Sequence, residues 1–262
     1  MQDKTSVLFL GISLPVIFFV LVSSNLFEHH YAEFWSNTLN LIFSSILLAV
    51  CVVNNLKIGS SGSHGRAWIF FTLAIALWYI AERIWTLNEL TDTDAWWSSF
   101  ADLFWFVGYV FYFMFGVMYL KPFASQISRK NILLASLVSL LVLIIVFYNT
   151  ESKTDSYEYV LYASYPVADS LMLIPSILGM MLFFKGQVKF SLAMLSFGML
   201  IFVISDYGFL YFDSIGAYYT GHLVDIPYVW AYAIFIGGVI SNLNIWNKID
   251  KNKPFNDQDA LR

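Results

Sequence analysis

The chain has 262 residues, of which 59% are apolar and 12% are charged, whereas soluble globular proteins carry roughly 45–50% apolar and about 25% charged residues. Its mean hydropathy is +0.67, and 14 basic against 18 acidic residues leave a net charge of −4. With no basic tract for phosphate groups, the composition excludes a soluble enzyme, a disordered chain and a nucleic-acid-binding protein, and it indicates a polytopic membrane protein.

Eight stretches are long and apolar enough to cross a bilayer, for which a helix needs about 20 mostly apolar residues. In chain order they cover 6–27, 34–56, 67–88, 98–120, 131–149, 159–184, 190–212 and 223–245. The short connections carry the Gly, Ser, Asn and Lys residues that mark breaks between helices. The sequence therefore predicts an all-α fold of eight transmembrane helices.

The distribution of basic residues predicts the orientation of these helices. With a cytoplasmic N-terminus, 12 of the 14 basic residues fall on the cytoplasmic side, and only Arg83 and Lys153 fall in the outer half. Because cytoplasmic loops are enriched in Lys and Arg, we expect a multi-pass protein of the cell membrane with both termini in the cytoplasm. At the outer interface we expect an aromatic belt of Trp96, Trp97, Tyr157, Tyr159, Tyr218 and Tyr219.

Two segments share an arrangement of acidic residues. Glu82 and Asp206 each follow a small residue and lie 124 positions apart, and Asp102 and Asp225 lie 123 positions apart. In each segment a tyrosine follows the second acid by seven positions, on the same helix face. These tyrosines are Tyr109 and Tyr232.

This arrangement predicts an internal repeat of two four-helix units, 1–122 and 128–246, followed by a cytoplasmic tail, 247–262. Because each unit has an even number of helices, both enter the membrane from the same side. We therefore expect a pseudo-twofold axis along the membrane normal, as in the parallel class of membrane repeats.

Five acidic residues lie within the predicted spans or at their outer edge. A charged carboxylate there costs at least a few kcal/mol unless it is solvated, paired or protonated. We therefore expect an outward-opening acidic pocket between the third, fourth, sixth, seventh and eighth helices. Its carboxylates are Glu82, Asp102, Asp169, Asp206 and Asp225.

A structural role is the alternative for these acids. Asp102, Asp169 and Asp225 come early in their predicted helices, where a carboxylate can cap the N-terminus or lie at the positive end of the helix dipole. Glu82 and Asp206 lie near helix C-termini, where the dipole disfavours a carboxylate. The pair Glu82 and Asp206 is therefore the strongest candidate for catalytic residues.

Other side chains near these acids are candidates for ligand binding. Adjacent helix positions diverge by about 100°, so we expect Arg83 to pair with a carboxylate of another helix. His222 precedes Asp225 by three positions, which favours a shared face and leaves a divalent metal as an alternative. Aromatic residues pack between helices or line a pocket wall, and these are Trp78, Tyr79, Trp85, Trp105, Tyr109, Trp230 and Tyr232.

The remaining histidines and several mechanisms carry less weight. His29 and His30 lie beside two glutamates in a second candidate metal cluster, whereas His64 lies in a Gly-Ser-rich connection where we expect it to be solvated. No lysine lies in the middle of a span, which excludes a retinal Schiff base. No phosphate-binding loop with its lysine and no nucleophile elbow is present. The metal and any cofactor stay unknown.

Residues 67–245 resemble a multi-helix membrane domain that is often fused to diguanylate-cyclase or histidine-kinase output domains in bacteria and archaea. The resemblance depends on Asp102 with the aromatic residues and Gly108-Tyr109 after it, on Tyr165-Pro166 followed by Asp169, and on Ser205-Asp206. It implies a membrane sensor of an unidentified ligand. Only 16 residues follow Trp246, so we expect a separate signalling partner.

The segment from Gly198 to Asp206 is also similar to the second acidic motif of the YhhN-like lysoplasmalogenase family, which are eight-helix membrane hydrolases. In this resemblance Glu82 stands in place of the first aspartate of that family. It implies that Glu82 and Asp206 activate a water molecule against a vinyl-ether or other lipid bond.

These observations lead to one main expectation and two alternatives. We expect a membrane-embedded ligand-binding or sensory protein whose pocket opens to the extracytoplasmic side. The alternatives are a lipid hydrolase that uses the acid pair and a proton-coupled transporter in which the acids titrate. The expected partners are the lipid bilayer, a small-molecule or lipid ligand and a signalling protein, with no nucleic acid.

Overall fold

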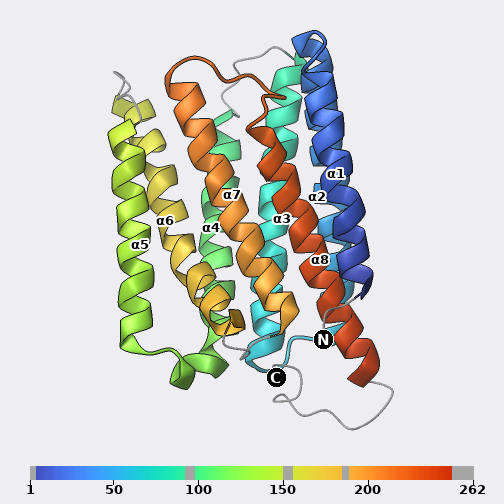
Figure 1. Cartoon of the computed structure of the whole chain (residues 1–262), viewed down its shortest axis with the longest axis vertical. Coiled ribbons are helices and arrows are strands. Elements are labelled where there is room, and N and C mark those ends of the chain that lie inside the picture. Colours follow the sequence, from blue (N-terminus) through green and yellow to red (C-terminus); the bar gives the residue numbers. More distant parts are fainter. Residues whose placement is uncertain (1–3, 92–97, 150–155, 185–188, 250–262) are drawn as a thin grey trace.

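The computed structural model describes residues 4–91, 98–149, 156–184 and 189–249, and it is an all-α bundle with no strand in these ranges (Figure 1). Eight helices are long and apolar enough to cross a membrane, which confirms the predicted polytopic membrane fold. They are α1 (Lys4–Ser24), α2 (His29–Ile58), α3 (Gly62–Thr91), α4 (Ser98–Leu120), α5 (Arg129–Asn149), α6 (Ser156–Phe184), α7 (Phe190–Ser214) and α8 (Asp225–Ile249).

The helices are offset from the predicted spans mainly at their polar ends. Helix α2 begins five residues before the predicted start at 34, and α3 begins at Gly62 rather than 67. Apolar composition marks the hydrocarbon crossing, whereas backbone hydrogen bonding continues into the interface. A short 3₁₀ helix, η1 (Lys121–Gln126), joins α4 to α5. The predicted belt residues Trp96, Trp97, Tyr157 and Tyr159, the outer Lys153 and most of the tail 247–262 lie outside the described residues or their described side chains.

Six helices form a closed ring around the centre of the bundle. Each packs against the next in the order α2, α3, α4, α6, α7, α8 and back to α2. Helix α1 packs outside this ring against α8 and α2, and α5 packs outside it against α6. Helix α1 begins and α8 ends at the same end of the bundle, which is called the proximal end below (Figure 1). The opposite end, with the α7–α8 connection, is the distal end.

The order of helices in the ring is the one that the predicted repeat requires, because exchanging α2, α3 and α4 with α6, α7 and α8 leaves the order unchanged. Positions that correspond in the repeat also meet across the centre. Trp78 stacks on Phe202, with ring centroids 5.1 Å apart, and Tyr112 lies 6.1 Å from Phe235. These are contacts expected near a twofold axis, and the superposition of the two halves stays a prediction.

The proximal half of the ring is filled by an aromatic core, which consists of Trp68, Phe71, Tyr112, Phe115 and Phe235. All five side chains are buried, and Phe71 lies 4.9 Å from Phe115 and 5.7 Å from Phe235 between ring centroids. The core joins helices on opposite sides of the ring.

His64 belongs to this packed end, so the expectation that it is solvated is wrong. Helix α3 already begins at Gly62, and His64 is 3% exposed. Its Nε2 accepts a hydrogen bond of 3.2 Å from Trp68 Nε1, and its ring stacks against Trp246. The Gly-Ser composition predicted a loop, whereas packing against α4 and α8 continues the helix.

Candidate functional site

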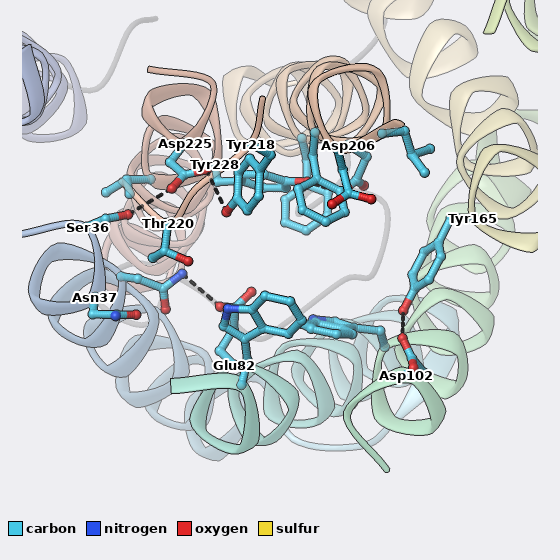
Figure 2. Close-up of a pocket in the computed structure, with 18 of the residues that line it drawn as sticks. Ser36, Asn37, Glu82, Asp102, Tyr165, Asp206, Tyr218, Thr220, Asp225 and Tyr228 are labelled. Atoms are coloured by element: carbon cyan, nitrogen blue, oxygen red, sulfur yellow. Dashed lines mark hydrogen bonds between the residues drawn. The ribbon is translucent and has the colours of Figure 1, made fainter. Parts of the chain in front are cut away.

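A cavity of about 290 Å³ lies in the distal half of the ring, beyond the aromatic core (Figure 2). Its walls come from the distal parts of α2, α3, α4, α6, α7 and α8 and from the connection between α7 and α8. Phe202, which stacks on Trp78, forms part of the lining. The cavity therefore ends at the stacked rings of Phe202 and Trp78, next to the aromatic core.

Five carboxyl groups line this cavity, and they come from four helices. Four of them were expected from the sequence, whereas Asp213 was not. Asp213 follows Asp206 by seven positions, so the same-face spacing along α7 was a signal that could have found it. The five residues are Glu82, Asp102, Asp206, Asp213 and Asp225. In Figure 2 Asp206 and Asp225 lie on one side of the open centre, Glu82 lies opposite them, and Asp102 lies to one side.

Asp206 is held by two tyrosines. Tyr228, one turn into α8, donates a hydrogen bond of 2.5 Å to its Oδ1. The hydroxyl of Tyr109 on α4 lies 2.7 Å from its Oδ2. The carboxylate therefore joins α7 to both α4 and α8 while it faces the cavity.

Asp169 lies behind Tyr109 and does not line the cavity, so its expected place in the pocket wall is wrong. It lies in the middle of α6, fully buried, rather than near a helix N-terminus. Its Oδ1 is 2.8 Å from the Tyr109 hydroxyl, and its Oδ2 has no hydrogen-bond partner among the described residues. The prediction was wrong because it used only the depth of Asp169 in the membrane. Depth does not determine which face of α6 is turned toward the cavity.

The position of Tyr109 requires a second proton. One hydroxyl donates one hydrogen bond, and an ionised carboxylate only accepts, yet the Tyr109 oxygen is within 2.8 Å of both Asp169 and Asp206. A proton on Asp169 satisfies both contacts, because Asp169 then donates to Tyr109 while Tyr109 donates to Asp206. The three residues form a hydrogen-bonded chain from the buried interior to the cavity.

Glu82 receives its hydrogen bonds from α8, which belongs to the second predicted repeat unit, and from α2. Tyr232 on α8 donates to Oε1 at 3.3 Å, and Asn40 donates to Oε2 at 3.0 Å. Tyr232 itself is buried and does not line the cavity. The contact of Tyr232 with Glu82 corresponds in the predicted repeat to the contact of Tyr109 with Asp206.

Arg83 hydrogen bonds to an amide rather than to a carboxylate of another helix. Its Nη2 donates a hydrogen bond of 2.6 Å to Asn40 Oδ1, and its guanidinium lies 5.3 Å from the centre of the Tyr79 ring. Asn40 thus links Arg83 to Glu82. The expected ion pair is absent from the described residues, and Arg83 does not line the cavity.

Asp102 and Asp225 complete the acidic wall. Asp102 Oδ1 accepts a hydrogen bond of 2.5 Å from Tyr165 on α6. Asp225 begins α8, where its Oδ2 accepts hydrogen bonds from Ser36 Oγ at 3.1 Å and from the backbone N–H of Gly221 at 2.7 Å. Its hydrogen bonds tie the start of α8 to α2 and to the preceding loop. This is the structural role that the capping alternative anticipated in part.

The connection between α7 and α8 covers the distal end of the cavity. Tyr218 and Thr220 contribute to the lining, and Tyr218 donates to Asp225 Oδ1 at 3.3 Å. Burial and the Asp225 carboxyl raise the pKa of Tyr218, so its hydroxyl stays protonated and remains a donor. Thr220 donates to Glu89 at the end of α3, and Tyr219 donates to Asn25 Oδ1 at 2.6 Å.

Gly221 fixes the path of this connection. Its φ of 92° lies in the left-handed region that favours glycine, and a Cβ there would lie 2.3 Å from the carbonyl carbon of Ala32. The loop backbone can therefore lie directly on α2. This contact brings Tyr218 and Thr220 over the cavity.

His222 lies in the same connection but not in the cavity wall. Its Nδ1 accepts a hydrogen bond from the Val224 N–H at 3.2 Å, and its ring lies 4.4 Å from Phe212. It precedes the start of α8, so the expected helical face shared with Asp225 does not exist. Partial burial lowers the pKa of His222, which keeps its imidazole neutral near pH 7.

The described residues contain no group of three or more His, Cys, Asp or Glu side chains arranged to hold a metal ion. The ring of His29 packs against Tyr219, with centroids 4.2 Å apart. In the second candidate cluster, His29 is thus part of the contact between α2 and the α7–α8 connection, whereas His30 is exposed and lies near Tyr31 of its own helix.

The acid pair combines features of the two roles that the sequence left open. Glu82 and Asp206 line one cavity, as expected for a functional pair. Each nevertheless accepts two hydrogen bonds from protein side chains, as expected for a structural pair.

The aromatic candidates divide into two groups. Trp85, Trp105 and Tyr109 line the cavity, whereas Trp78, Tyr79, Trp230 and Tyr232 do not.

Sequence reasoning missed the polar residues that α2 contributes to the wall. They have no charge, and the periodicity of α2 gave no signal that distinguished them from surface positions. They are Ser36, Asn37 and Asn40.

Comparison with known proteins gives no match: no family model, no curated protein and no solved structure is similar to this chain. The two resemblances noted above therefore stay predictions.

Proposed function

We propose that the chain is a membrane-embedded ligand-binding protein of the sensory type, and that its distal cavity receives a ligand from the extracytoplasmic side. The supporting observation is the cavity itself, with a volume of about 290 Å³, acidic and aromatic walls, and a packed aromatic core beyond it. Ligand sites in proteins are concave, mostly apolar and equipped with a few placed polar groups.

The packed proximal half favours binding over transport. A transporter exposes its site alternately to both sides by rocking two halves against each other. In this chain, side chains from the two predicted repeat units pack against each other below the cavity, with Trp78 stacked on Phe202 and also 5.7 Å from Tyr112. Opening a path to the proximal end would require these stacked rings to separate.

A melting screen of the purified protein in detergent tests this function. Small soluble molecules of all charge classes are added to the wild type and to Val229→Phe, which places a larger side chain in the cavity wall. We expect at least one class to raise the melting temperature of the wild type and not of the variant. Equal responses of both proteins to every molecule would contradict a cavity ligand.

A second candidate function is lipid hydrolysis, and one observation favours it. Glu82 and Asp206 lie on opposite sides of the same cavity, and each has a tyrosine hydroxyl within hydrogen-bond distance (Figure 2). One carboxylate can act as general base toward water and the other, when protonated, as general acid.

Incubation with a vinyl-ether lysophospholipid separates this candidate from binding alone. A hydrolase would release a fatty aldehyde, detected by mass spectrometry, and Asp206→Asn would abolish the release. Binding of the lipid without aldehyde formation would leave the sensory proposal in place and remove the hydrolase.

A further inference from the structure

The described residues that line the cavity are acidic rather than basic. Five of these residues carry a carboxyl group, and none of the described lining residues is Lys, Arg or His. Among the described residues, Arg83 follows Glu82 directly in the chain but does not line the cavity, and its guanidinium is hydrogen bonded to Asn40 and packed over Tyr79. Because a buried carboxylate is costly without an opposite charge, the cavity favours a positively charged occupant.

Four of the five carboxyls have described hydrogen-bond donors, and those donors are neutral groups. Tyrosine hydroxyls donate to Glu82, Asp102, Asp206 and Asp225. Such donors orient a carboxylate without neutralising it. Asp102 accepts a single described hydrogen bond, on Oδ1 from Tyr165, which leaves its Oδ2 without a partner among the described residues.

The same wall is rich in aromatic rings close to Asp102. Trp105 lies 6.4 Å from Tyr165 and 5.9 Å from Trp85 between ring centroids, and all three line the cavity. Faces of Trp and Tyr attract cations through the ring quadrupole, and aromatic cages bind quaternary ammonium groups in this way. Carboxylates and aromatic rings together are the combination that suits an organic cation.

We propose that this cavity binds a small organic cation, in which an amine or quaternary ammonium group lies between Asp102 and the rings of Trp85 and Trp105. The proposal rests on the proposed ligand-binding function and names the class of its ligand. The cavity volume of about 290 Å³ is near the lower end of the roughly 300–1,000 Å³ typical of ligand pockets, so the cation is small.

Binding of choline to the purified protein, measured by isothermal titration calorimetry, tests the proposal. The matched probe is the uncharged isostere of choline in which a tert-butyl group replaces the trimethylammonium group. Ethanolamine provides a primary-amine arm, and the tert-butylacetate anion provides the opposite charge. We expect choline or ethanolamine to bind at least about tenfold more tightly than the isostere, because only the cations engage the carboxylates and the ring faces.

Three variants locate the interaction. Asp102→Asn should weaken cation binding by about tenfold or more, whereas Asp102→Glu, which retains the charge, should keep the preference for the cation over the isostere. Glu28→Gln removes one charge from an exposed position outside the cavity and should leave binding unchanged. Melting temperatures of all variants show whether each is folded.

The outcomes separate this inference from the function on which it rests. If the isostere or the anion binds the wild type as well as the cations do, and Val229→Phe abolishes that binding, the cavity has a ligand and the cation proposal is overturned. If no probe of any charge binds, the cation proposal is also overturned, and the broader melting screen decides the ligand-binding function by itself. Loss of cation preference in Glu28→Gln would place the effect outside the cavity.

Discussion

The two halves of the ring use the same helices in different ways. In the proximal half, Trp68, Phe71 and Phe235 are buried against one another and fill the centre. In the distal half the centre is open, and carboxyl groups held by tyrosines surround it. The boundary is the stacked pair of Trp78 and Phe202.

This difference shows that one set of helices can form a close-packed core at one end and enclose a cavity at the other. Association of helices in a bilayer depends on close packing and interhelical hydrogen bonds rather than on a hydrophobic driving force. The proximal half supplies the packing. The distal half supplies hydrogen bonds such as Tyr109 to Asp206, which can hold helices together around a cavity.

The largest expected effect is on the proximal side. Phe71→Ala removes a fully buried ring from the aromatic core and should lower the free energy of unfolding by about 3 kcal/mol or more. Phe209→Ala removes a ring that already borders the cavity and should cost about 1 kcal/mol. Unfolding in detergent, followed by circular dichroism, compares the two. Equal losses would contradict the distinction between a packed and an open half.

The hydrogen-bonded chain at the boundary gives a second, smaller effect. Tyr109→Phe removes the hydroxyl between Asp169 and Asp206. We expect a loss of about 2 kcal/mol, because the buried Asp169 loses its one described hydrogen bond and Asp206 retains only the one from Tyr228. Asp169→Asn retains the shape and a donor, as the protonated acid does, and should stay within about 0.5 kcal/mol of the wild type. A larger loss in Asp169→Asn than in Tyr109→Phe would show that Asp169 is not the protonated member.

Removing the charge of either member of the acid pair should lower the free energy of unfolding by about 1 kcal/mol. In Glu82→Gln and Asp206→Asn the amide offers one acceptor oxygen to two donors, so each variant should be less stable by this amount. Glu28→Gln, an exposed position, serves as the control and should be unchanged. A rise in the melting temperature of either cavity variant would mean that the buried charge outweighs its hydrogen bonds.

Single cysteine substitutions, which perturb the structure least, test whether the distal end faces the extracytoplasmic side. Cysteine at Ser214, at the distal end of α7, should react with an impermeant thiol reagent in intact cells. Cysteine at Ser60, in the exposed connection between α2 and α3 at the proximal end, should react only after lysis. The natural Cys51 is buried and contributes no background. Reaction of the Ser60 variant alone in intact cells would reverse the predicted orientation.

The sequence by itself determined the number of helices and the depth of the acids. Both depend on local properties, because a span needs a continuous apolar stretch and a carboxylate within it is conspicuous. For the same reason the sequence predicted that Glu82, Asp102, Asp206 and Asp225 share a cavity, and the structure brings all four into its lining.

Only the tertiary structure decided which partners each acid has. The rotation of α6 places Asp169 behind Tyr109, and the approach of α2 makes Asn40 the link between Arg83 and Glu82. The rotation of a helix about its axis and the identity of its neighbours depend on contacts between residues far apart in the chain. The hydropathy of a segment is a local property and does not predict those contacts. The fold-wide pattern was therefore visible in the sequence, whereas the hydrogen bonds that shape the site required the packed ring.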